Sequence, residues 1–184
     1  MRLTRGSPDV SRDQRRFRDA LGLFPTGVAI VTTVANGERL GMTISSFGSL
    51  SLEPPLVLFS MHRKANGYPA WQQATHYAIN VLNEDQQELS NRFARARGEK
   101  WIGVSTVPGK TGVPLLPNAV ATFECVAHSR CDGGDHEIFL GRVIDFTENL
   151  AKRGRPLVFF GGQYRKLEDA GQASPSEADL LHGW

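Results

Sequence analysis

The dipeptide Asn36-Gly37 constrains the fold of this chain more than any other local feature. It follows a dense β-branched run, VAIVTTV from Val28 to Val34, which has the composition of a buried strand. Asn-Gly between two β-patterned runs favours a two-residue hairpin, because both residues tolerate the positive φ of such turns. The sequence therefore predicts an antiparallel hairpin whose second strand begins at Arg39.

The predicted return strand is rich in hydroxyl groups. Five of the nine residues from Thr43 to Ser51 are Ser or Thr, with apolar residues between them. Because side chains alternate faces in a strand, a regular strand would place Thr43, Ser45 and Phe47 on one face. A bulge at Ser45-Ser46 would change that assignment. The hydroxyl face is equally compatible with solvent and with a flat, hydrogen-bonding ligand, since hydroxyls both donate and accept.

Strand patterns outnumber helix patterns in the rest of the chain. After a turn at Glu53-Pro54-Pro55, strands are expected at Leu56–Met61, Tyr77–Leu82, Ala119–His128, Glu137–Phe146 and Leu157–Phe160. Residues 98–118, rich in Gly and Pro, are expected to form a long loop. Strands joined by hairpins favour a mainly β fold, a closed or partly closed antiparallel barrel with two or three flanking helices.

Capping patterns predict where those helices begin. Ser11 with Gln14 resembles a capping box and predicts a first helix, with an apolar stripe of Phe17, Leu21 and Phe24. Asn66 is expected to cap a short helix that runs through Trp71 to Ala74. Asn83 with Gln86 predicts a further helix over residues 84–97.

The length of 184 residues indicates one domain. We expect that domain to span residues 13–167. A mobile N-terminal arm at 1–12 and a polar, mobile C-terminal tail at 168–184 are expected to flank it.

Composition and motif content argue against several classes of function. A net charge of +2 gives no electrostatic basis for binding nucleic acid or an anionic membrane. No membrane span or secretory signal is predicted, and the two cysteines, Cys125 and Cys131, favour a reducing cytosol. The five histidines lack metal-ligand spacing, and no P-loop or Gly-x-Gly-x-x-Gly motif is present.

Three short segments have both a structural and a functional interpretation. The basic loop His62-Arg63-Lys64, which precedes Asn66, is either a solvated turn or a phosphate-binding loop. His136, next to Asp135, is either structural or held in one tautomer at the edge of a site. Lys100-Trp101 is similarly ambiguous.

Six segments, taken in order, resemble the short-chain flavin reductases, the reductase components of two-component flavin-dependent monooxygenases. Together they cover roughly residues 17 to 167, and they read FRDALGLFPTGVAIVTT, GMTISSFGSLSLEPPLVLFSM, YAINVLNEDQQELSNRFA, GVPLLPNAVATFECVA, GDHEIFLGRV and PLVFFGGQYRKL. The resemblance implies a split β-barrel of the FMN-binding type. It implies hydride transfer from NAD(P)H, with NADH favoured, to FMN or FAD, with FMN slightly favoured. It also implies a cytoplasmic homodimer and delivery of reduced flavin to a separate oxygenase.

The same resemblance implies which residues bind the cofactors. His136 would position the nicotinamide rather than abstract a proton. The residues implied to contact the flavin are Met42, Thr43, Ser45, Ser46, Phe47, Ser60, Arg63, Lys64, Asn66, Asn80, Val81, Phe93, Lys100 and Tyr164.

Other functions on a similar barrel remain as alternatives. The main one is an FMN-binding electron-transfer flavoprotein, which would hold FMN tightly and oxidise NADH poorly. A pyridoxamine-phosphate-type oxidase shares the barrel and FMN, but the Gly-Asp-His segment fits the reductases better. A haem-binding or purely structural barrel is disfavoured by the lack of an axial-ligand pattern.

Overall fold

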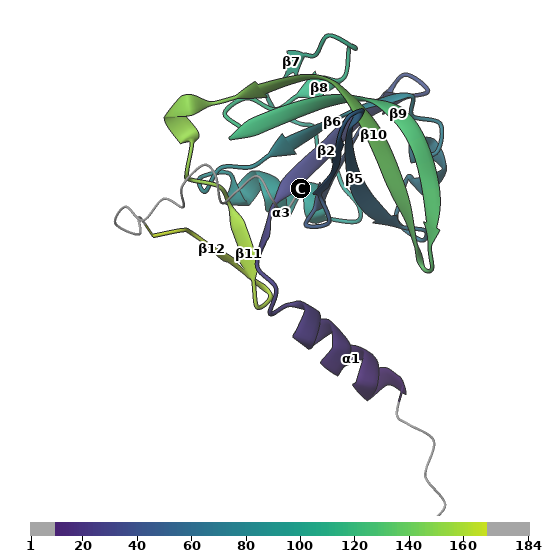
Figure 1. Cartoon of the computed structure of the whole chain (residues 1–184), viewed down its shortest axis with the longest axis vertical. Coiled ribbons are helices and arrows are strands. Elements are labelled where there is room, and N and C mark those ends of the chain that lie inside the picture. The colour runs from purple at the N-terminus through teal and green to yellow at the C-terminus, as the bar shows by residue number, and fades with distance from the viewer. Residues whose placement is uncertain (1–9, 169–184) are drawn as a thin grey trace, which may run out of the picture.

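A computed structural model describes residues 10–168 of the chain. It is mainly β, with antiparallel sheets and few helices (Figure 1). The helices are α1 (Val10–Leu21), α2 (Tyr68–Trp71), α3 (Gln87–Ala94) and the 3-10 helix η1 (Leu150–Lys152). The strands are β1 (Thr26–Gly27), β2 (Ala29–Ala35), β3 (Glu38–Ile44), β4 (Gly48–Leu52), β5 (Pro55–His62), β6 (His76–Val81), β7 (Val107–Pro108), β8 (Pro114–Leu115), β9 (Ala121–Gly133), β10 (His136–Glu148), β11 (Val158–Phe160) and β12 (Gln163–Arg165).

The predicted hairpin at Asn36-Gly37 is confirmed. Strands β2 and β3 pair directly across it, and the two turn residues have φ values of 53° and 78°. Positive φ at both central residues is the requirement of a type I′ turn, and its twist matches that of the flanking strands.

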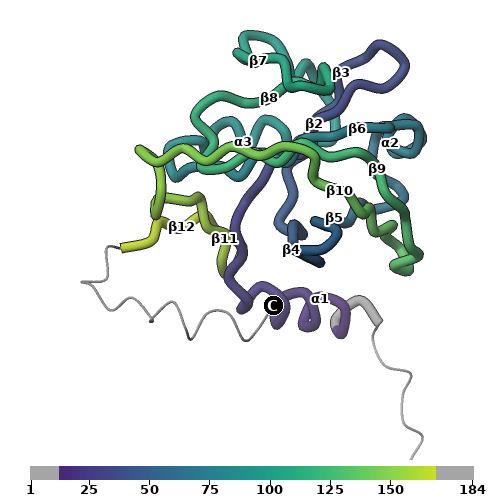
Figure 2. The backbone as a smooth tube through the Cα atoms, turned by 45° about the horizontal axis from the view of Figure 1, so that its top comes forward, coloured from purple at the N-terminus to yellow at the C-terminus, as the bar shows by residue number. Residues whose placement is uncertain are grey.

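A seven-stranded sheet dominates the structure, in the order β3-β2-β6-β9-β10-β5-β4. Strands β3 and β4 are its two edges, yet only residues 45–47 separate them in the sequence. The chain from Ile44 to Gly48 can reach about 14 Å at full extension. Six inter-strand spacings in a flat sheet would require about 29 Å. The sheet must therefore curl until its two edges approach each other. The tube view shows strands that curve round instead of lying in one plane, with β4 and β5 below β9 and β10 (Figure 2).

This arrangement corrects the prediction of one regular return strand. The chain leaves β3 after Ile44 and enters β4 on the opposite edge, so alternation does not continue through Phe47. The turn predicted at Glu53-Pro54 is confirmed, since Leu52 of β4 faces Pro55 of β5 across it. Within residues 10–168 the sheet has no hydrogen-bonded ladder between β3 and β4, so the barrel is not closed there.

Two apolar cores lie on opposite faces of the curled sheet. Alternate residues of β2 divide between them, with Val31 in the inner core and Ile30 in the outer one. The inner core contains Phe59 and further aromatic side chains. The outer core lies under α3, whose Phe93 is fully buried there. Burial on both faces explains why β2 is a dense β-branched run without polar alternation.

Several local predictions need correction. The short helix α2 begins after Gly67, which has a positive φ, and Asn66 does not cap it. Asn83 and Gln86 do pair through hydrogen bonds, but they close the turn before α3, which covers only Gln87–Ala94. The 98–118 segment contains the small β7–β8 ladder, and a twelfth strand, β12, follows the Gly161-Gly162 turn.

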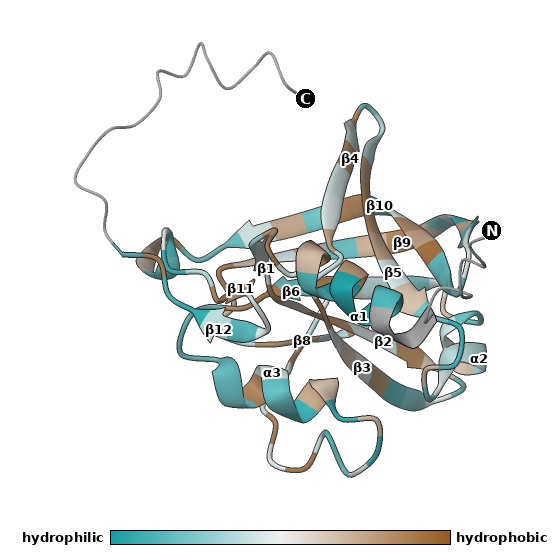
Figure 3. Cartoon of the chain, turned by 90° about the horizontal axis from the view of Figure 1, so that it is seen from below, coloured by the Kyte–Doolittle hydropathy of each residue, from teal (hydrophilic) through white to brown (hydrophobic). Residues whose placement is uncertain are grey.

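The predicted first helix is present as α1, and it extends away from the sheet (Figure 1). Its apolar residues remain exposed, Phe17 to 67% and the following Phe24 to 73%. In the hydropathy view, hydrophobic and hydrophilic residues are mixed along α1 (Figure 3). Within residues 10–168, no helix is long and apolar enough to span a bilayer. Most of the predicted arm and tail lies outside the described residues.

Candidate functional site

The three-residue link between β3 and β4, Ser45–Phe47, is fixed to β5 by one side chain. The Ser46 Oγ accepts a hydrogen bond from the Ser60 backbone N–H at 3.0 Å and donates to the Ser60 carbonyl at 3.2 Å. The β4–β5 ladder ends at Gly48 and Leu58, so Ser60 has no strand partner on that side. The hydroxyl of Ser46 takes the place of the missing partner and satisfies both backbone groups.

The other predicted residues of this segment point in different directions. Ser45 is exposed, and its hydroxyl makes no hydrogen bond to any other residue of the described chain. The Thr43 hydroxyl donates to the Ser90 carbonyl of α3 at 2.7 Å, whereas Met42 packs against the inner core. The Phe47 ring packs on Phe123 with centroids 5.6 Å apart. The hydroxyls therefore do not form one continuous wall. Of the three expected to contact flavin, Thr43 and Ser46 are bonded to the protein within residues 10–168, and Ser45 is available to a ligand.

A carboxylate is paired with two histidines at the end of β5, the strand to which Ser46 is bonded. His62 of β5 pairs in register with His136 of β10, and their rings meet edge to face with centroids 5.0 Å apart. The Asp135 carboxylate lies 2.7 Å from His136 Nδ1 and 3.8 Å from His62 Nε2. The hydrogen bond from His136 lowers the pKa of the Asp135 carboxyl group. Because residues of a strand alternate faces, His62 lies on the same face of β5 as Ser60.

The hydrogen bonds of the two rings define their tautomers. The Lys64 backbone N–H donates to His62 Nδ1 at 2.9 Å, so a neutral His62 carries its proton on Nε2, toward Asp135. A neutral His136 donates from Nδ1 to Asp135, which leaves Nε2 as an acceptor for a ligand.

Arg63 holds the turn that carries Asp135 and His136. Its guanidinium donates to Asp132 at 2.6 Å, to the Gly134 carbonyl at 3.1 Å and to the Tyr68 hydroxyl at 3.0 Å. The hydrogen bond to Asp132 raises the pKa of Arg63 further. These contacts make the guanidinium a clamp on this turn, and the phosphate contact expected of Arg63 stays a prediction. The neighbouring Lys64 is exposed and forms no ion pair within residues 10–168.

Two predicted flavin contacts are buried in the protein. Asn80 has no exposed surface, and its amide bonds the Ile30 carbonyl at 3.0 Å and the Leu116 N–H at 2.9 Å. Phe93 is also fully buried, with its ring packed edge to face on Trp101 at 4.8 Å. Both side chains support the sheet from buried positions, and the flavin contacts expected of them stay predictions.

Three further predicted residues gather around α3. Tyr164 places its hydroxyl 2.8 Å from the Ser90 Oγ, so Ser90 is linked to both Tyr164 and Thr43.

Lys100 Nζ donates to the Phe93 carbonyl at 3.0 Å and to the Gly41 carbonyl at 3.2 Å, and burial lowers the pKa of Lys100. On the far side of the same region, the Asn66 side chain donates to the Ala96 carbonyl at 2.6 Å. Val81 is half-buried within the β6 ladder.

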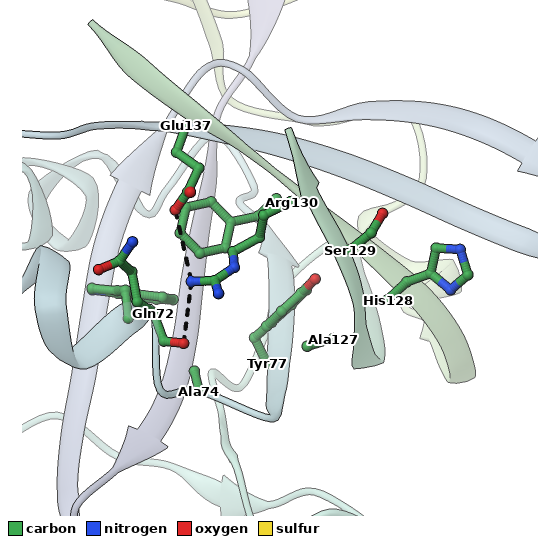
Figure 4. Close-up of a pocket in the computed structure, with 10 residues that line it drawn as sticks. Gln72, Ala74, Tyr77, Ala127, His128, Ser129, Arg130 and Glu137 are labelled. Atoms are coloured by element: carbon green, nitrogen blue, oxygen red, sulfur yellow. Dashed lines mark hydrogen bonds and ion pairs between the residues drawn. The ribbon is translucent and has the colours of Figure 1, made fainter. Parts of the chain in front are cut away.

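A cavity of about 470 Å³ opens on the inner side of the sheet (Figure 4). The Arg130 guanidinium crosses it, donating to the Gln72 carbonyl at 3.2 Å and lying 3.8 Å from the Glu137 carboxylate. Sequence reasoning missed this cavity and the role of His62. Both depend on the register of β5 against β10 and β9 against β10, which local patterns do not reveal.

Comparison with known proteins agrees with this geometry. Residues 21–168 match the family model described as flavin reductase like domain. The chain is 42% identical to the FMN reductase (NADH) SmoA of Agrobacterium fabrum, over 84% of this chain and 87% of that protein. It is 39% identical to HsaB, the reductase subunit of a flavin-dependent monooxygenase of Rhodococcus jostii, over 91% and 86% of the two chains.

A solved structure extends the likeness to three dimensions. The NADH:FAD oxidoreductase SgcE6 of Streptomyces globisporus, in complex with NAD and FAD fragments, superposes with a TM-score of 0.82 at 37% identity. The alignment covers 88% of this chain and 96% of that one. The chain belongs to the flavin reductase like domain family.

Proposed function

We propose that this protein is an NADH-dependent flavin reductase that supplies reduced flavin to a separate monooxygenase. The observation that carries the proposal is that Ser46, next to the free Ser45 hydroxyl, is bonded to Ser60, two residues along β5 from His62 of the His62–Asp135–His136 group. Membership of the flavin reductase family, and the names of the relatives at 39–42% identity, support the same activity. FMN and FAD are both candidate acceptors, since one relative is named for each.

The residues of the link are suited to hold a flavin. A bound flavin accepts hydride from NADH and so supplies the redox chemistry. Ser45 offers an unpaired hydroxyl, and Ser46 fixes the backbone beside it so that the link does not move when a ring lies against it. Exposed Lys64, on the loop after β5, provides a positive charge for a flavin phosphate.

His136 is suited to orient the nicotinamide. Its free Nε2 is an acceptor when the ring is neutral, and a carboxamide N–H is the group it would accept from. Asp135 holds the opposite nitrogen, and the Arg63 clamp fixes the turn. The contribution of this group is positioning, which hydride transfer requires more than proton transfer.

The finer architecture follows from the same family. We propose a split β-barrel of the FMN-binding type and a homodimer with the flavin near the subunit interface. The exposed apolar residues of α1 support a dimer, as does an apolar groove of about 560 Å³ lined by Phe47, Leu52, Leu56, Phe123 and Phe146. Cys125 and Cys131 are both free, which accords with the cytoplasmic location proposed.

The first prediction concerns the reaction. The purified protein, mixed with NADH in air, should oxidise NADH well above the protein-free rate only when FMN or FAD is added. NADPH should be a poorer donor. An absorbance assay at constant NADH and increasing flavin measures this. No flavin-dependent oxidation would refute the reductase. Tightly retained FMN without turnover would favour the alternative, an electron-transfer flavoprotein.

The second prediction separates two adjacent serines. Ser45→Ala should raise the flavin Kd about three- to tenfold, the equivalent of losing one hydrogen bond, without changing the free energy of unfolding. Ser46→Ala should lower the free energy of unfolding by about 1–2 kcal/mol, because the Ser60 backbone groups lose their partner. Flavin titration and urea unfolding of both variants measure these effects. If Ser46→Ala weakened flavin binding and Ser45→Ala did not, the Ser45 hydroxyl would not be the ligand contact.

The third prediction concerns His136. His136→Ala should lower kcat/KM for NADH by about tenfold or more while the flavin Kd is retained, because the nicotinamide loses its orientation. His128→Ala, at an exposed position of β9, is the matched control and should leave both quantities unchanged. Unchanged kinetics in His136→Ala would remove the nicotinamide assignment.

The fourth prediction concerns assembly. The protein should sediment as a dimer at micromolar concentration, and Leu21→Glu with Phe24→Glu should shift it to monomer by placing charge in an apolar interface. Arg16→Glu, about 140° around α1 from Leu21, should not. A wild-type monomer at these concentrations would contradict the proposal.

A further inference from the structure

A second cavity lies along the open edge of β3, beyond the hydroxyl link. It has a volume of about 290 Å³, which is small for a whole cofactor and suits one half of a dinucleotide. Its lining includes Arg39 and Gly41 of β3, Asn66 and Gly67 of the loop after β5, and Lys100 and Trp101. We propose that this cavity binds the adenosine 5′-phosphate part of a dinucleotide. The inference rests on the proposed function and extends it to a second subsite.

The Arg39–Trp101 pair provides a surface for a purine. The guanidinium carbon of Arg39 lies 5.0 Å from the centre of the Trp101 ring, stacked over its face. The indole is held from another side by the edge-to-face contact with Phe93 at 4.8 Å. Arg39 is exposed, so the outer face of its planar guanidinium is open. Arginine planes stacked in this way are suited to a nucleic-acid base, which presents a π-face of its own.

Lys100 provides a donor for the phosphate. An ammonium group has three N–H donors, and Lys100 uses two of them, on the Gly41 and Phe93 carbonyls. The third remains for a ligand, and partial burial of the side chain strengthens its attraction for an anion. The lining holds two basic residues against one acidic residue, Glu99, so its charge favours a phosphate.

The position of the cavity fits a ligand that begins at the hydroxyl link. Arg39 and Ser45 are six residues apart along the chain at the β3 edge, or about 20 Å if extended. Because β3 is an edge strand, no further strand of the described residues 10–168 covers this side. The loop that carries Lys64 and Asn66 runs between the two ends, tied to the α3 end through Asn66 and Ala96. An isoalloxazine at Ser45 could therefore place a phosphate near Lys64 and an adenylate at Arg39.

FAD and NADH both contain this adenylate, whereas FMN does not. The shared chemistry can thus come from either source, and variants of Arg39 distinguish them. Arg39→Ala should raise the FAD Kd about tenfold and leave the FMN Kd unchanged, if the flavin supplies the adenylate. If NADH supplies the adenylate, Arg39→Ala should raise the KM for NADH by a similar factor with FMN and with FAD. The ratio of the FAD Kd to the FMN Kd should then stay the same as in the wild type. Arg39→Lys, which keeps the charge and removes the plane, should resemble Arg39→Ala.

Calorimetric titration of the full chain with ADP tests the cavity without turnover. ADP should bind the wild-type protein and bind Arg39→Ala about tenfold more weakly. Arg153→Ala, at another exposed arginine, should behave as wild type. Equal loss of FMN and FAD affinity in Arg39→Ala, or no change with FAD, NADH and ADP, would overturn the inference. ADP binding that depends on Arg39 in a protein inactive toward every flavin would refute the proposed function and leave this subsite intact.

Discussion

The short connection between β3 and β4 determines the shape of this protein. Three residues join strands that lie at opposite edges of a seven-stranded sheet, so the sheet curls until those edges approach. The link is held by a single hydroxyl, since Ser46 bonds both backbone groups of Ser60 beyond the end of the β4–β5 ladder. The place where the edges meet is therefore rigid and polar, and the adjacent Ser45 is free.

Because side chains alternate along β5, one face of this strand packs in the core and the other carries polar side chains. Phe59 and Met61 point into the inner core, while Ser60 and His62 lie on the opposite face of the same strand. Register brings His136 of β10 beside His62, and Asp135 lies between the two rings. The apolar face stabilises the sheet, and the polar face is consequently positioned to a precision that a loop alone would not provide.

Local sequence signals predicted much of the fold and less of the site. Asn36-Gly37 determined its hairpin because the required φ values are a property of those two residues. The end of β3 at Ile44 could not be predicted, since residues 48–52 pair with β5, and β5 is placed at the far edge of the sheet by its pairing with β10. The burial of Asn80 and Phe93 is likewise non-local, because Leu116 and Trp101 cover them from other segments. The clamp made by Arg63 could not be predicted either, because its partners, Asp132 and Gly134, are about 70 residues away.

The central claim is that flavin lies where the two sheet edges meet. Backbone hydrogen–deuterium exchange with and without FMN tests it most directly. The account predicts slower exchange on FMN addition at Thr43–Phe47 and His62–Asn66, with little change around the inner cavity at residues 127–130. Protection confined to the inner cavity, with the link unchanged, would contradict the account.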